Sequence, residues 1–90
     1  MENLISGKVV YELYSVHGVP LDIVVETMRD HGITIQWLDF YNVAVTDGWN
    51  PYSTIAKIEN TVLYVMGPEY TEEFMRRLKW CIVKEYENIT

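Results

Sequence analysis

The sequence has little positive charge. Seven Lys and Arg residues stand against 13 Asp and Glu residues, which leaves a formal net charge of −6. A domain that binds nucleic acid normally carries the opposite balance, because Lys and Arg neutralise phosphates and supply most of the non-specific affinity. The composition therefore argues against a nucleic-acid partner. The deficit is uneven, since residues 1–66 carry eight acids and three bases whereas residues 67–90 carry five acids and four bases.

Cysteine occurs once, as Cys81, so no disulfide can form within the chain and nothing indicates an oxidising compartment. No apolar run approaches the ~18 residues that a membrane-spanning helix needs. The opening Met-Glu-Asn lacks the basic and then apolar order of a signal peptide. We therefore expect a cytoplasmic protein that has no membrane partner.

Signatures of catalysis and of metal binding are also missing. The two histidines, His17 and His31, are fourteen residues apart, and neither has a second ligand at helical spacing. The sequence contains no Gly-rich phosphate loop, no nucleophile elbow and no Cys-x-x-Cys motif. We therefore expect a protein that is not an enzyme, with no catalytic residues, no bound metal and no cofactor.

What the sequence does contain is apolar periodicity, with hydrophobic residues making up 49% of the 90 residues. This length and content predict one folded helical domain over residues 1–90, with a radius of gyration of about 12 Å. Gly and Pro divide the chain, because Gly commonly ends a helix and Pro commonly begins one. The predicted helices span residues 6–17, 20–31, 35–47, 51–66 and 68–87. The expected fold is all-α, a compact bundle of about five short helices.

Two of these helices are rich in β-branched residues. The third begins with β-favouring residues, but its apolar residues lie on one side of a helix, and Thr34 is a suitable N-cap. In the fourth, a hairpin across residues 54–66 would make the fold α+β. Strand alternation fails there because the apolar run is continuous, so a helix is favoured, capped by Asn50 and beginning at Pro51.

The helical periodicity also identifies a core. We expect Trp37 on the third helix and Leu78 on the last helix to be buried, and Thr61 on the fourth helix to face away. The buried stripe predicted on the last helix consists of Phe74, Leu78, Cys81 and Ile82, with Tyr86 continuing it.

Aromatic residues are in excess, with three Trp and seven Tyr. Trp80 differs from the others because it lies off the buried stripe of the last helix. Outward-facing Trp and Arg side chains are typical anchors of protein interfaces. The candidate contact surface is therefore Arg76, Trp80, Val83 and Lys84, which a protein partner or a second copy of the chain in a homodimer would cover.

An acidic face is predicted on the second helix, where Asp22, Glu26 and Asp30 recur every four residues. Such a ridge could bind a divalent cation or imitate phosphates. The alternative is a solvated face, interrupted by Arg29.

The segment Tyr11–Gly32, about a quarter of the chain, has the pattern Leu-Tyr-x-x-x-Gly-x-Pro-Leu-Asp followed by a helix that ends in Gly. The residues that carry it are Leu13, Tyr14, Gly18, Pro20, Leu21, Asp22 and Gly32. This segment resembles the helical region that follows the aminoacylation core of alanyl-tRNA synthetases. The family's usual Asp-Thr-Tyr and Phe are replaced here by Ser15-Val16-His17 and Val19.

The chain also looks like short phage and prophage proteins that carry this synthetase-like segment. The resemblance implies two helices joined at a turn. It does not imply alanine activation, because 90 residues cannot house the ATP-binding sheet of such an enzyme.

Together these features predict a non-enzymatic, acidic protein-binding module, such as a phage-type accessory protein or an inhibitor of a host protein. The alternative is a small tRNA- or RNA-contacting helical appendage, which the synthetase-like segment and the bases around Trp80 suggest. The two hypotheses differ in salt dependence, because affinity for RNA falls steeply as salt rises. The net charge favours the protein-binding module.

Overall fold

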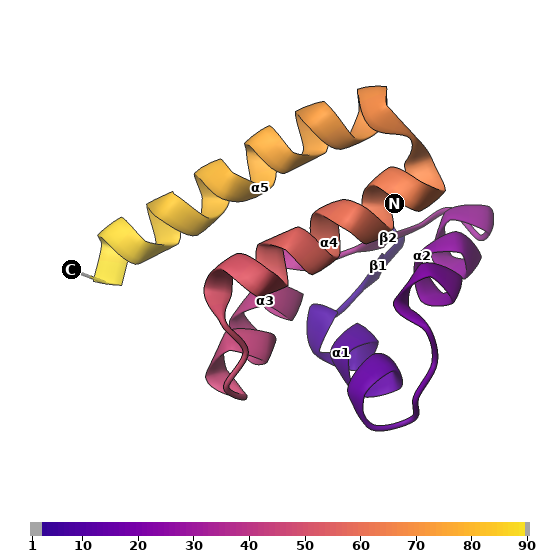
Figure 1. Ribbon diagram of the computed structural model, residues 1–90, viewed down its shortest axis with the longest axis horizontal. Helices are drawn as coiled ribbons and strands as arrows, with labels where there is room; N and C mark the ends of the chain where they lie inside the picture. Colours follow the sequence, from indigo (N-terminus) through magenta and orange to yellow (C-terminus); the bar gives the residue numbers. More distant parts are fainter. Residues whose placement is uncertain (1–2, 90) are drawn as a thin grey trace.

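Five helices and one pair of short strands make up the fold in the computed structural model, which describes residues 3–89. Their bounds are β1 Asn3–Ile5, α1 Gly7–Ser15, α2 Leu21–Asp30, β2 Ile33–Ile35, α3 Trp37–Thr46, α4 Pro51–Met66 and α5 Pro68–Ile89. In Figure 1, α4 and α5 run antiparallel, and α5 lies on the side of the molecule opposite α1. The radius of gyration is 12.7 Å, close to the value expected from the length.

The five predicted helices are confirmed. Residues 54–66 lie within α4, so the hairpin alternative for that segment is wrong. Asn50 caps α4 as predicted, because its Oδ1 accepts hydrogen bonds from the amides of Tyr52 at 2.9 Å and Ser53 at 3.1 Å. None of the helices among residues 3–89 is long and apolar enough to cross a membrane.

The strand pair was not predicted. β1 and β2 run parallel, with Asn3 opposite Ile33 and Ile5 opposite Ile35. The third helix therefore begins at Trp37 rather than at Ile35, and Thr34 lies in a strand instead of capping a helix. The β-branched segment becomes a strand because β1, thirty residues earlier in the chain, supplies its hydrogen-bonding partner.

The core lies where α1, α2, α3 and α4 meet beneath α5. Its most completely buried large side chains include Val10, Leu21, Phe40, Ile58 and Val62. Trp37 and Leu78, at 8% and 5% exposed, are buried as predicted.

Three threonines are also buried, and the prediction that Thr61 faces away from the core is wrong. The hydroxyls of Thr54, Thr61 and Thr71 each donate to the carbonyl oxygen four residues earlier, at 2.8, 2.8 and 2.6 Å. Because this bond satisfies the hydroxyl within its own helix, a threonine can occupy an apolar interface at little cost.

The first residue of α1 touches the backbone of α3. A Cβ atom added to Gly7 would lie 2.1 Å from the amide nitrogen of Phe40 and 2.4 Å from the carbonyl oxygen of Gln36. Only a glycine allows the two backbones to come this close.

Asp39 of α3 caps the start of α1 across this contact. Its Oδ2 accepts a hydrogen bond from the Lys8 amide at 2.8 Å and another from the Ser6 hydroxyl at 2.8 Å. These bonds favour the ionised carboxylate, so they lower the pKa of Asp39 below its ordinary value of 3.8. The polar side of α3 thereby satisfies an amide at the N-terminus of α1.

We expect Gly7→Ala to destabilise the fold by about 3 kcal/mol, because the added methyl group meets backbone atoms that cannot move separately. Gly67→Ala is a matched control. Gly67 follows α4 at a φ of 87°, but nothing lies within 4 Å of its added Cβ. The control should therefore cost only about 1 kcal/mol, from backbone conformation alone. Urea unfolding of both variants measures the difference, and equal losses would contradict the close contact.

We expect Asp39→Asn to lower the free energy of unfolding at pH 7 by about 1 kcal/mol, because a charged acceptor is replaced by a neutral one. A carboxyl group whose pKa is lower in the folded chain than in the unfolded chain stabilises the fold fully at a pH above its pKa in the unfolded chain. This contribution is lost as the pH falls through its pKa in the folded chain. The difference between variant and parent should therefore shrink below pH 3.8. Urea unfolding at a series of pH values tests this, and a difference independent of pH would contradict it.

Candidate functional site

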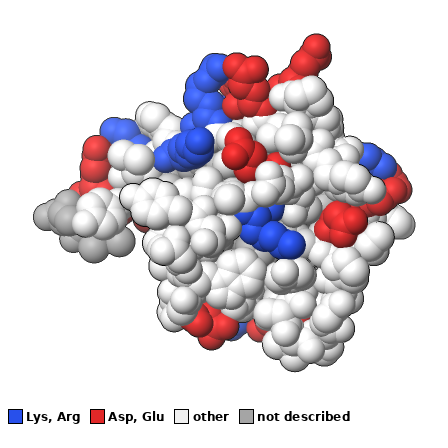
Figure 2. Space-filling model, viewed as in Figure 1, with Lys and Arg blue, Asp and Glu red and all other residues white. Residues whose placement is uncertain are grey.

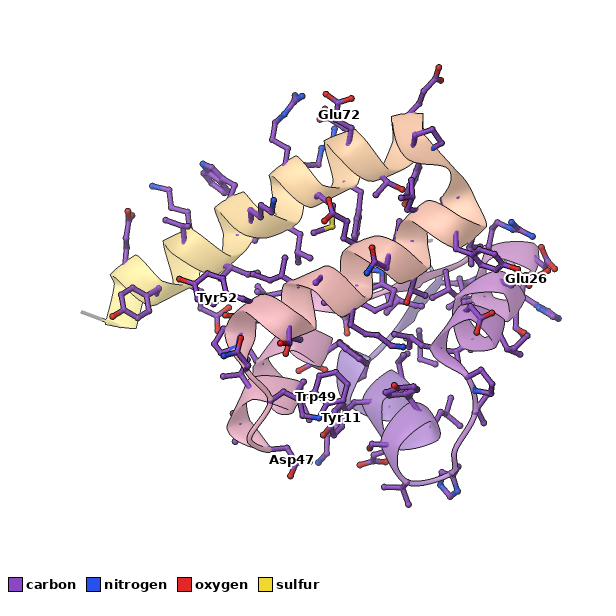
Figure 3. All side chains as sticks on the ribbon, in the orientation of Figure 1. Tyr11, Glu26, Asp47, Trp49, Tyr52 and Glu72 are labelled. Atoms are coloured by element: carbon purple, nitrogen blue, oxygen red, sulfur yellow. The ribbon has the colours of Figure 1, made fainter. Side chains whose placement is uncertain are left out.

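The predicted contact residues lie on the outer face of α5, turned away from the core. Trp80 is 62% exposed and Val83 is 55% exposed, whereas Met75 and Leu78 on the opposite face are buried. Figure 3 shows the labelled Glu72 on this outer side, pointing away from the rest of the molecule. The helix therefore carries two apolar surfaces, of which only one packs against the body.

Tyr86 is a further exposed aromatic residue, near the C-terminal end of α5. It was predicted to continue the buried stripe, but its exposed fraction is 70%. The reason is visible in Figure 1, where the last turns of α5 extend past the N-terminal end of α4. A hydrogen bond from Asn42 Nδ2 of α3 to Glu85 Oε1, 2.9 Å long, holds this part of α5 to the body. We name the exposed residues Trp80, Val83 and Tyr86 the α5 patch.

The two arginines before the α5 patch are paired with carboxylates of the same helix. Arg76 lies 2.9 Å from Glu73 and 3.9 Å from Glu72, and Arg77 lies 3.2 Å from Glu73. Figure 2 shows this mixture along the upper edge, where positive and negative side chains lie next to each other. The face thus carries both signs of charge rather than a basic stripe.

Lys84 has two neighbours. Its Nζ lies 3.8 Å from a carboxylate oxygen of Glu87 and 5.4 Å from the centre of the Trp80 ring. The second distance is within the range of a cation–π interaction, which at an exposed site contributes about 0.5–1 kcal/mol. Lys84 therefore steadies the Trp80 ring in an outward position.

The predicted acidic face of α2 is interrupted. Glu26 is exposed and points outward in Figure 3, while Asp22 is half-buried. Asp30 forms an ion pair with Arg29 at 3.0 Å, so its charge is locally balanced. Within residues 3–87, no three His, Cys, Asp or Glu side chains are placed to hold one metal ion.

A groove of about 510 Å³ lies between α1 and α3. The Tyr11 hydroxyl on its wall donates to Asp47 Oδ2 at 2.5 Å, and the Trp49 ring packs edge-on against Tyr11 at 5.7 Å. These three residues lie side by side in Figure 3. The bond to Asp47, together with burial, raises the pKa of Tyr11 above 10.0.

The Tyr11–Asp47 pair is a contact between two elements of the fold. The Tyr11 phenol stays protonated at neutral pH and already donates its proton to Asp47, so the pair joins α1 to the end of α3. No sequence pattern predicts this contact, because the two residues are 36 positions apart and neither belongs to a motif. The two histidines, His17 and His31, are both exposed.

No protein-family model, no curated protein and no solved structure matches the chain.

Leu78 and Trp80 lie two residues apart on α5 and should respond oppositely to truncation. We expect Leu78→Ala to cost about 3 kcal/mol, because it leaves a cavity in the core. Trp80→Ala should change the free energy of unfolding by no more than about 0.5 kcal/mol, since its ring is mostly in solvent. Thermal and urea unfolding measure both values. If Trp80→Ala unfolds the protein as readily as Leu78→Ala, then Trp80 belongs to the core and the α5 patch is not a free surface.

Proposed function

We propose that the protein is a non-enzymatic, acidic protein-binding module that contacts its partner through the outer face of α5. The observation that carries the proposal is the α5 patch, where a Trp, a Val and a Tyr are each more than half exposed along the C-terminal half of α5. Water normally faces polar side chains on such a surface. Clustered exposed apolar residues with a polar rim are typical of interaction sites.

The residue types favour a protein as the partner. Trp, Tyr and Arg are enriched among the residues that dominate the energy of protein interfaces. Trp80 and Tyr86 supply two of these residue types in the α5 patch, and Arg76 lies one helical turn before Trp80. The partner that fits best is a protein with an apolar groove that admits one side of a helix, with residues spaced three and four positions apart as anchors.

The alternative of an RNA partner receives less support. The arginines beside the α5 patch each contact a carboxylate of α5, so a phosphate would have to displace it. The whole chain would also approach a polyanion with a net charge of −6. Charge repulsion would then oppose association at every distance within the Debye length.

The synthetase-like segment contributes to the scaffold in this proposal. Tyr11 and Leu21, within the segment, are both buried, and the Val19 amide donates to the Leu13 carbonyl at 3.0 Å in the turn between α1 and α2. Residues that shape a turn and fill a core account for the resemblance without a shared activity. We propose that the module is a phage-type accessory protein or an inhibitor of a host protein, acting in the cytoplasm, where a single free cysteine is common.

The experiment is an affinity capture with the purified protein from cells that produce it, followed by measurement of Kd for the captured protein. We expect Trp80→Ala to weaken binding about 30-fold, which corresponds to about 2 kcal/mol for an anchor residue. Tyr64→Ala is the matched control, because this tyrosine is 77% exposed but lies on α4. It should change the Kd by less than about threefold.

Three outcomes would contradict the proposal. The first is a captured protein that binds the Trp80→Ala variant as tightly as the parent. The second is binding to tRNA that falls steeply with salt, which would identify the RNA-contacting appendage instead. The third is a sedimentation experiment in which the measured mass of the parent rises with concentration and that of Trp80→Ala does not. This result would make a second copy of the chain the partner.

A further inference from the structure

Within residues 3–89 the sheet has two strands, so the outer edge of β2 has no strand to pair with. The Gln36 amide donates to the Ile5 carbonyl at 3.0 Å, and Ile5 is opposite Ile35 in the parallel register. In a parallel pair, alternate residues of a strand direct their amide and carbonyl groups toward the partner. Gln36 and Thr34 therefore face β1, and the amides and carbonyls of Ile33 and Ile35 face the other way.

A groove of about 340 Å³ follows that outer edge. Ile33 and Ile35 line it and so does Thr34, which lies on the opposite face of the strand. Three successive residues of β2 line the groove and none of the described residues of β1 does, which places it beside β2 on the side away from β1.

The other wall of this groove, which we name the β2 groove, is apolar. Its lining from α2, α4 and α5 includes Met28, Val62, Met66 and Phe74. Tyr70, which is 51% exposed, stacks on Phe74 with ring centres 6.1 Å apart and forms part of the rim. Methionine side chains adapt to different shapes, so this wall can accommodate an aliphatic or an aromatic group.

Among the described residues, Arg29 is the one charged residue that lines the β2 groove. Its Nη1 donates to the Val65 carbonyl at 3.0 Å, and its Nε and Nη2 donate to Asp30 at 3.1 and 3.0 Å. These three bonds fix the guanidinium group and leave two of its five N–H donors for a ligand, so recognition at Arg29 rests on hydrogen bonds, because Asp30 already balances its charge. A carboxylate is the group that such donors bind best.

We infer that the outer edge of β2 and the β2 groove bind an extended segment of another protein. The segment adds to the sheet as a third strand, places an apolar side chain in the groove and directs a carboxylate to Arg29. Main-chain hydrogen bonds to Ile33 and Ile35 supply affinity, and the groove and Arg29 supply specificity. This site is separate from the α5 patch and does not depend on it.

The first test is selection of a displayed library of random heptapeptides on the purified protein. We expect the enriched peptides to combine one large apolar residue with an Asp or Glu. Met66→Glu, which places a carboxylate in the groove, should weaken binding of the enriched peptides at least tenfold. Leu63→Glu is the matched control, since it makes the same change on the solvent side of α4, where Leu63 is 44% exposed. It should leave the affinity unchanged, and circular dichroism verifies that both variants are folded.

The second test asks how the selected peptide binds. Hydrogen exchange of the Ile33 and Ile35 amides should slow at least tenfold on binding. N-methylation of the peptide residue opposite them should abolish binding, because it removes a main-chain donor. Arg29→Gln should weaken binding of the peptide that contains Asp or Glu. It should leave unchanged the binding of the same peptide with Asn or Gln at that position.

Several results would overturn the inference. The first is a selection in which no peptide binds the parent more tightly than Met66→Glu. The second is an N-methylated peptide that binds as tightly as the unmodified one. The third is hydrogen exchange of the Ile33 and Ile35 amides at the same rate with and without peptide. Slower exchange at higher protein concentration without any peptide would assign the edge to a second copy of this chain instead.

Discussion

The fold depends on how closely α1 approaches α3. At Gly7 the two backbones lie so near that a single methyl group would overlap the Phe40 amide. That approach brings Asp39 within hydrogen-bond distance of the Lys8 amide, where it caps α1. It also aligns the strands, because β1 ends just before Gly7 and β2 ends just before α3, so the two helices hold the strands side by side.

The second constraint is the length of α5. With 22 residues it is longer than any helix that it packs against, so its core-facing side is covered only over part of its length. Leu78 lies over the body and is buried, whereas Tyr86 lies beyond it and is exposed. The α5 patch follows from this excess length together with the apolar residues of the outer face. The β2 groove lies on other elements, so the two proposed contacts differ in mechanism, one using a helix face and the other a strand edge.

Much of the helical structure could be predicted because its signals are local. Asn50 and Pro51 mark the start of α4 through a side-chain cap and a fixed φ, both of which act within one turn. The burial of Leu78 and the exposure of Trp80 follow from their positions around one helix, since the apolar stripe of α5 defines which side faces the core. The same reasoning failed for Thr61, because a hydroxyl bonded to its own helix behaves as an apolar group at a buried position.

The sequence by itself therefore determined the number of helices, their approximate ends and the outward position of Trp80, all of which depend on residues within a few positions of one another. Only the tertiary structure decided the parallel pairing of β1 with β2, the hydrogen bond between Tyr11 and Asp47, and the exposure of Tyr86. The first two join residues more than 25 positions apart, and the third depends on where the neighbouring helices stop. No local pattern encodes such distances, because they result from how the helices pack.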